Sequence, residues 1–316
     1  MKKKYTSFIK KILFYVFFLA VIYFFWKTLY QNFDALDFNS ISINFWYLTL
    51  SFIFYIIFFL SLTLLWRNLL FSNLDKKEKK SINSREIIYI NSVSWISKYI
   101  PGKISMILTK VLYLKNKFNT PKRITFISCL YEHIFQVITS FLLSFPFIIY
   151  YFQNTSNSAY VYLSALSFVG LLIFIHPYIF NRILNIVLRF LKKEAIKEKN
   201  FLSLDQIYQY ILWYSFSMIL KWISFLFLVM SISNLSLFSE VSFYIFAWIF
   251  AGVIWIISLF APNGLWVREW VLVFLLQFVI WLELAIIISI FSRLWFSICD
   301  VWIGMYVGYE KYVRQI

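Results

Sequence analysis

Charged residues are scarce in this sequence of 316 residues, and so are glycine and proline. Asp, Glu, Lys and Arg make up 14% of the chain, hydrophobic residues make up 62%, and there are only 6 glycines and 5 prolines. A soluble domain carries roughly 25% charged residues. The composition therefore excludes a soluble enzyme and a disordered protein, and so few glycines leave no room for a glycine-rich phosphate loop.

Cysteine is equally rare. Cys129 and Cys299 both lie inside apolar segments, and their spacing matches neither a metal site nor a disulfide framework. No nucleophile with a neighbouring base is visible either. We therefore expect no enzymatic activity, no metal and no cofactor.

What is abundant is apolar sequence in long runs. A helix needs about 20 apolar residues to cross the roughly 30 Å of bilayer hydrocarbon. Runs of this kind predict an all-α polytopic membrane protein, and we treat residues 1–316 as one integral membrane domain. The predicted spans are 12–30, 45–66, 124–150, 158–180, 208–232 and 283–309.

The net charge of +16 is concentrated in a few segments. Of the 30 Lys and Arg residues, 26 lie in 1–11, 67–85, 98–123, 182–199 and 311–314, and none lie in 31–44, 151–157 or 233–240. Cytoplasmic loops of membrane proteins are rich in Lys and Arg. The pattern predicts a cytoplasmic-membrane protein with both termini in the cytoplasm. Nucleic-acid binding is not expected, because the basic residues sit in short loops between apolar spans.

This charge pattern requires two segments to enter the membrane and return. Segments 67–85 and 98–123 are both basic, and the apolar stretch between them is too short to span. Pro101-Gly102 interrupts the helix there, so we predict a broken hairpin over 86–117. Pro262-Asn263-Gly264 interrupts a second hairpin, over 241–281, that enters from the opposite side.

The chain then divides into two halves, 12–150 and 158–309, each read as span, span, broken hairpin, span. Three crossings per half make the halves an inverted repeat, which is a recurring plan among transporters. The alternative is eight full crossings, with a loop near 291–293.

Several ionisable residues fall inside apolar segments, where each costs at least about 2.5 kcal/mol to insert. They are Glu132, His133, Lys221, Arg268, Glu269, Arg293 and Asp300. Arg293 and Asp300 share one helix face, and internal salt bridges (Arg293 with Asp300, Glu132 with His133) are one reading. The other is a polar path for a charged group.

The residues around the first break also allow two readings. Lys98, Lys103 and Lys110 either extend to the cytoplasmic headgroups or hold an anion. In the second case, the free N–H groups of a helix that restarts after Pro101-Gly102 favour a phosphate. Helix ends that face each other from the two hairpins would form an anion-binding centre.

Two segments, in this order, resemble a known family. SKYIPGKISMILTKVLYLK (97–115) resembles the R/K-Y-x-P-G-K segment of the lysylphosphatidylglycerol synthase transmembrane region family, and APNGLWVREWVLVFL (261–275) resembles its P-G-G-L-G-V-R-E segment. FSRLW (291–295) and LYEHIFQVI (130–138) are similar to two further family stretches. The resemblance covers roughly 12–310.

By motif matching, the resemblance implies roles for individual residues. The matching residues are Pro101, Gly102, Lys103, Glu132, Pro262, Gly264, Arg268 and Glu269. The chain departs from the family pattern at four positions: Asn263 and Trp266 stand for glycines, His133 for arginine and Gln136 for aspartate.

The resemblance implies a flippase that moves an anionic phospholipid, glycolipid or lipid-linked intermediate between leaflets in cell-envelope biosynthesis. Lys98 and Lys103 would capture phosphate, Arg268 and Arg293 would relay it, and Glu132 and Glu269 would balance the cations. The alternatives are an accessory scaffold for an envelope glycosyltransferase, a possible partner, and a membrane-embedded transferase. The sequence indicates neither the lipid, the direction of transport nor the oligomeric state.

Overall fold

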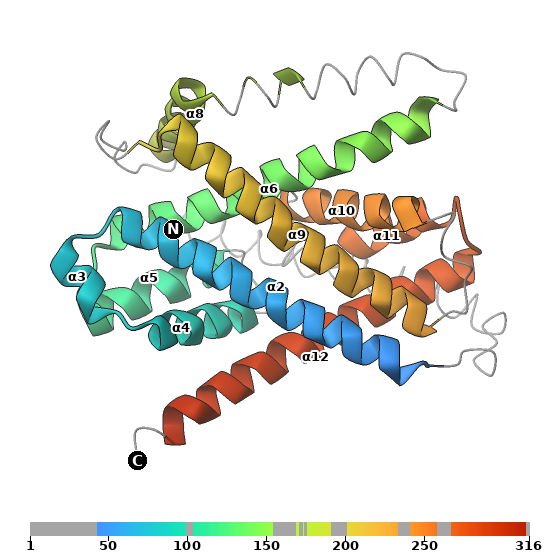
Figure 1. Ribbon diagram of the computed structural model, residues 1–316, viewed down its shortest axis with the longest axis horizontal. Helices are drawn as coiled ribbons and strands as arrows, with labels where there is room; N and C mark the ends of the chain where they lie inside the picture. Colours follow the sequence, from blue (N-terminus) through green and yellow to red (C-terminus); the bar gives the residue numbers. More distant parts are fainter. Residues whose placement is uncertain are drawn as a thin grey trace, which may run out of the picture.

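The computed structural model describes residues 43–98, 104–153, 169–170, 173, 176–190, 201–232, 241–257 and 267–313, and within these ranges the regular structure is entirely helical (Figure 1). The helices are α2 (Phe45–Ser72), α3 (Lys76–Ser81), α4 (Ser84–Ser97), α5 (Ile104–Phe118), α6 (Lys122–Gln153), α8 (Pro177–Phe190), α9 (Leu204–Ile232), α10 (Val241–Ile257), α11 (Val267–Leu276) and α12 (Leu282–Val313). The all-α polytopic class predicted from the sequence is confirmed.

Four helices are long and apolar enough to cross a membrane: α2, α6, α9 and α12. They correspond to the predicted spans 45–66, 124–150, 208–232 and 283–309, each extended by a few residues at one end or both. The predicted span 12–30 and most of 158–180 lie outside the described residues. The described end of the second of these spans consists of His176 and the start of α8. Helix α8 begins with Pro177 at its first position, where the missing N–H of proline has no cost.

Helix α8 corrects one boundary. The sequence predicts a loop over 182–199, but α8 continues to Phe190. Its first turns pack on α6, because Phe180 stacks on Tyr131 with ring centroids 5.8 Å apart.

The centre of the fold is an antiparallel pair, α2 and α9, which cross in the foreground of Figure 1. The Asn44 amide, at the start of α2, donates to the Ser231 carbonyl near the end of α9 over 2.8 Å. Small hydroxyl side chains line the seam: Ser224 Oγ donates to the Ser51 carbonyl over 2.7 Å. Small residues at a helix interface let the backbones approach closely and supply interhelical hydrogen bonds.

Two pairs of short helices lie on either side of this central pair, α4 with α5 and α10 with α11 (Figure 1). With 10 residues, α11 rises only about 15 Å, half of the hydrocarbon thickness. Helix α12 continues without interruption through residues 291–293. The loop near 291–293 that the alternative of eight full crossings assumed is therefore absent.

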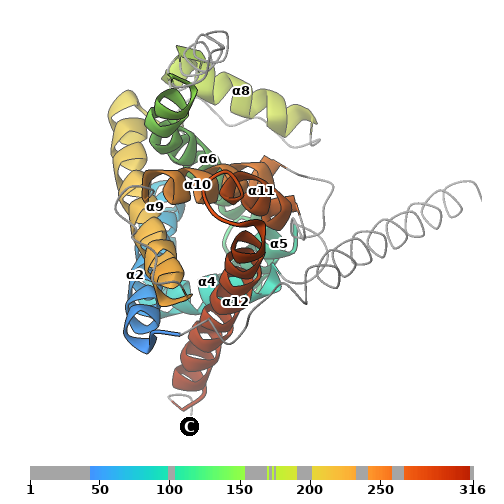
Figure 2. The ribbon, with the colours of Figure 1, turned by 90° about the vertical axis from the view of Figure 1, so that its right-hand side faces the viewer.

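Two of the long helices, α6 and α12, each pack on both short pairs. Helix α6 packs on α5, its neighbour in sequence, and also on α10, while α12 packs on α11 and also on α4. Figure 2 shows α12 passing beside α4 and α6 beside α10. With this packing, the end of α4 and the start of α11 lie in the middle of the molecule.

Candidate functional site: a central charged cluster

Six of the predicted site residues gather in the middle of the fold. We call them the central charged cluster: Lys98, Lys221, Arg268, Glu269, Arg293 and Asp300. They come from α9, α11, α12 and the residue that caps α4. Lys98 interacts electrostatically with Asp300, Arg293 and Arg268, and Lys221 with Arg268, Lys98 and Asp300.

The first ion pair of the cluster joins α4 to α12. Lys98 Nζ lies 2.6 Å from Asp300 Oδ2, and the Tyr55 hydroxyl donates to Oδ1 of the same carboxylate over 2.6 Å. The Asp300 side chain is only 1% exposed, whereas that of Lys98 is 17% exposed. The carboxylate is thus the more buried member of the pair, and the amine is partly exposed.

The second ion pair joins α11 to α12. Arg293 Nη1 donates to Glu269 Oε1 over 2.8 Å. The other terminal nitrogen, Arg293 Nη2, is buried and has no hydrogen-bond partner among the described residues. A guanidinium can bind an oxyanion through two parallel N–H groups, and Nη2 is the half of this fork that no described residue engages.

Three cations of the cluster rest on aromatic rings. Lys98 Nζ lies 4.4 Å from the centroid of the Trp95 ring. The Arg268 guanidinium lies 3.9 Å from that of Trp248, and Lys221 Nζ lies 5.3 Å from that of Phe58. A ring face attracts a cation but does not neutralise it. Lys221 forms no ion pair with any described residue.

Helix ends explain why these charges sit where they do. Lys98 caps the C-terminus of α4, where the helix dipole favours a cation. Glu269 lies in the first turn of α11, where the dipole favours an anion. Arg268 also lies in that turn, against the dipole, and its guanidinium rests over the Trp248 ring.

The salt bridges expected within one segment do not form. Arg293 and Asp300 are two turns apart on α12, about 10 Å along the axis, and each pairs with a different helix. Glu132 pairs with Lys110, and His133 Nδ1 instead contacts the Cys129 carbonyl at 2.7 Å.

The Lys110–Glu132 pair forms a separate buried centre between α5 and α6. Lys110 Nζ lies 2.8 Å from Glu132 Oε2 and 4.0 Å from the centroid of the Trp66 ring, and both residues are fully buried. Lys110 therefore does not extend to the headgroups. Glu132 thus pairs with Lys110, and not with Arg268 or Arg293, whose charges it was expected to balance. The remaining predicted residues, Pro101, Gly102, Lys103, Pro262, Asn263 and Gly264, lie outside the described ranges.

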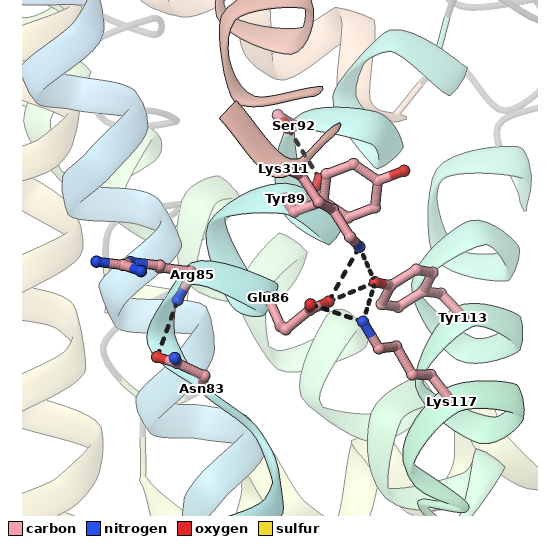
Figure 3. Close-up of polar contacts among 8 residues, drawn as sticks. All are labelled: Asn83, Arg85, Glu86, Tyr89, Ser92, Tyr113, Lys117 and Lys311. Atoms are coloured by element: carbon pink, nitrogen blue, oxygen red, sulfur yellow. Dashed lines mark hydrogen bonds and ion pairs between the residues drawn. The ribbon is translucent and has the colours of Figure 1, made fainter. Parts of the chain in front are cut away.

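A third polar group, which the sequence reading missed, joins the ends of α4, α5 and α12 (Figure 3). Glu86 accepts from Lys117 over 2.7 Å and from Lys311 over 3.2 Å, and also from the Tyr113 hydroxyl. Burial opposes ionisation of Glu86, but hydrogen bonds from the two lysines and the tyrosine outweigh it and lower the pKa of this carboxyl. A usable signal existed: Glu86 and Lys117 are the two ends of the predicted hairpin 86–117, and the arms of a hairpin end side by side.

Comparison with known proteins gives one match. A search of curated proteins and a search of solved structures found none. The family described as "Lysylphosphatidylglycerol synthase TM region" matches residues 9–308, nearly the whole chain. Its membrane character agrees with the four long apolar helices. The chain therefore belongs to the lysylphosphatidylglycerol synthase transmembrane region family.

Proposed function

We propose that this protein moves an anionic lipid, or a lipid-linked intermediate, between the leaflets of the cytoplasmic membrane, as a transporter rather than an enzyme. The observation that carries the proposal is the central charged cluster. It places four cations between membrane-length helices, at the point where α4 ends and α11 begins. A cation in hydrocarbon is costly unless a counterion accompanies it, and an anionic headgroup supplies that counterion.

In the proposed pathway, α4–α5 and α10–α11 are re-entrant hairpins that reach the middle of the membrane from opposite sides. Helices α4, α5 and α11, with 14, 15 and 10 residues, are too short to cross. The packing of α6 on α10 and of α12 on α4 supports an inverted repeat. The headgroup passes over Lys98, Arg268 and Arg293, and the lipid tails remain in the bilayer. The Asp300 and Glu269 carboxylates hold these cations until the headgroup replaces them.

The test is transport by the purified full chain in liposomes that contain phosphatidylglycerol labelled on its acyl chain with a fluorophore. Dithionite quenches only label exposed in the outer leaflet, so movement between leaflets increases the quenched fraction. Arg268→Ala and Arg293→Ala should abolish the increase, while Arg268→Lys should retain part of it, because the planar fork is lost and the charge is kept.

The control is Arg189→Ala, which removes an exposed arginine of α8 that lies outside the cluster. It should transport lipid at the unmodified rate. Circular dichroism and gel filtration establish that each variant is folded. If folded Arg268→Ala and Arg293→Ala both moved lipid at the unmodified rate, the cluster would not be the pathway.

A further inference from the structure

We propose that Tyr55 is a positioning residue, which holds the Asp300 carboxylate in place while the Lys98 amine leaves it to bind a headgroup. The inference rests on the proposed function and deepens it, because it says which member of this ion pair moves. Lys98 is the member that exchanges its partner, and Asp300 is the member that stays.

The two oxygens of the Asp300 carboxylate accept from different parts of the fold. Lys98, which caps α4, places its Nζ atom 2.6 Å from Oδ2, and Tyr55 of α2 donates its hydroxyl to Oδ1 over 2.6 Å. A hydroxyl at this distance from a carboxylate makes a charge-assisted hydrogen bond. Because each donor has an oxygen of its own, Tyr55 can keep its bond when Lys98 moves away.

The part of α12 that carries Asp300 is fastened to α2. Trp295 Nε1 donates to Ser51 Oγ over 3.1 Å, one turn along α2 from Tyr55. The ring of Phe296 lies 4.9 Å from the Tyr55 ring, centroid to centroid. Tyr55 is only 1% exposed, so its bond to Asp300 is shielded from water. Displacement of the carboxylate would require these contacts between α12 and α2 to break together.

The Lys98 amine is held less firmly than the carboxylate. It is partly exposed, and it ends a flexible four-carbon stem. The amine also lies 4.4 Å from the centroid of the Trp95 ring, which attracts a cation whether or not Asp300 is bound. Trp95 is itself packed against α2, edge to face with Phe58 at 5.9 Å and Phe59 at 5.8 Å. The amine can therefore turn toward a phosphate while the ring beneath it stays in place.

The hydrogen bond from Tyr55 makes this separation less costly. A buried carboxylate that loses its cation is strongly destabilised. A hydrogen bond to a bare carboxylate is stronger than one to a carboxylate whose charge is shared with an amine. Tyr55 thus stabilises the separated state more than the paired state. Without its hydroxyl, Lys98 should leave Asp300 less often.

The test measures how often the Lys98 amine leaves the carboxylate, without added lipid. The purified full chain in detergent is treated with a small amine-reactive acylating reagent, and mass spectrometry follows the modification of Lys98. Tyr55→Phe removes only the hydroxyl and should slow this acylation about tenfold, as expected for one hydrogen bond to a charged group. The matched control is Tyr214→Phe, which should not change the rate. Tyr214 is also buried, but its hydroxyl has no hydrogen-bond partner among the described residues.

The sign of the effect separates positioning from a merely structural bond. A hydroxyl that only helped to hold the ion pair together would, once removed, let the amine leave more often. Faster or unchanged acylation in folded Tyr55→Phe therefore overturns the proposal. Replacement of Tyr55 by 3-fluorotyrosine keeps the ring and strengthens the donor, so it should accelerate acylation, and it decides the question if Tyr55→Phe does not fold.

A double variant tests whether Tyr55 acts through Asp300. Asp300→Asn alone should accelerate acylation of Lys98, because the amide holds the amine without a charge. Adding Tyr55→Phe to this chain should change the rate less than about twofold, since no carboxylate charge remains for the hydroxyl to stabilise. An undiminished effect of Tyr55→Phe in the Asp300→Asn chain would show that Tyr55 acts on Lys98 by another route, and the proposal would be wrong.

The outcomes also distinguish this inference from the proposed function. In liposomes, Tyr55→Phe should move labelled phosphatidylglycerol at least about threefold more slowly, and Tyr214→Phe at the unmodified rate. Slow acylation with unimpaired transport in Tyr55→Phe overturns the role of Tyr55 in headgroup movement. Slow acylation together with unimpaired transport in Arg268→Ala and Arg293→Ala overturns the proposed function instead, and leaves Asp300 as the fixed member of its ion pair.

Discussion

At the scale of single residues, burial and partner decide what each charge can do. Lys98 and Lys110 come from the same segment of sequence and are both lysines, yet their surroundings differ. Lys110 is sealed between Glu132 and the Trp66 ring, whereas Lys98 keeps an exposed edge beside Asp300. A fully buried pair stabilises one arrangement of helices, whereas a pair with one partly exposed member can exchange its partner for a ligand.

We predict that the Lys110–Glu132 pair is structural. Lys110→Met should lower the stability of the protein by about 3–5 kcal/mol, because removal of one partner leaves a buried charge uncompensated. Adding Glu132→Gln to the same chain should recover part of this loss, because the uncompensated charge is then removed. Thermal unfolding of the detergent-solubilised protein measures both.

The matched control is Lys80→Met on α3, where the lysine is exposed, and its unfolding temperature should not change. Strictly additive effects of Lys110→Met and Glu132→Gln would contradict the prediction. They would show that the two side chains do not interact.

At the scale of helices, the sequence predicted the long elements and their breaks because both follow from local rules. The length of the apolar runs predicted the four described spans. The helix-breaking residues predicted the short helices α4, α5, α10 and α11. Partner choice was less predictable, since periodicity shows which face a residue occupies but not which helix lies opposite. Arg293 and Asp300 share a face of α12 and still bind different neighbours.

Gly304 of α12 lies against Ile96, near the C-terminal end of α4. A Cβ atom added to Gly304 would overlap the Cδ1 atom of Ile96, and Asp300 lies one turn earlier on α12. Gly304→Leu should therefore push α12 away from α4 and separate Asp300 from Lys98. We expect a loss of about 1–3 kcal/mol in stability, as for other overpacked sites, and slower lipid movement in the dithionite assay.

Gly308→Leu is the control, because nothing lies within 4 Å of a Cβ placed at that position. It should leave both stability and transport close to those of the unmodified protein. Ile96→Ala combined with Gly304→Leu should restore part of the loss by making room. If Gly304→Leu and Gly308→Leu had equal effects, close helix approach at Gly304 would not be the cause.

At the scale of the whole molecule, the distribution of charge agrees with the way the helices pack. The contacts of Glu86 with Lys117 and Lys311 bring the start of α4, the end of α5 and the end of α12 together (Figure 3). These ends belong to, or adjoin, the basic segments 67–85, 98–123 and 311–314. The rule that cytoplasmic loops are rich in Lys and Arg groups these segments at one end of the molecule. The packing of the helices independently places them at the same end.

The orientation in the membrane follows as a prediction: this end faces the cytoplasm, together with both termini. In a background from which the buried Cys129 and Cys299 have been removed, single cysteines at Glu78 and Glu194 should resist an impermeant maleimide applied to intact cells. Cysteines at Ser156 and Ser236, in the segments without basic residues, should react. Permeabilised cells should label at all four positions, which controls for accessibility. Anionic lipid attracts basic segments to the cytoplasmic face. Labelling of Glu78→Cys or Glu194→Cys in intact cells would show that the orientation is the opposite one. Lys98, the first cation of the proposed pathway, would then lie nearer the outer leaflet.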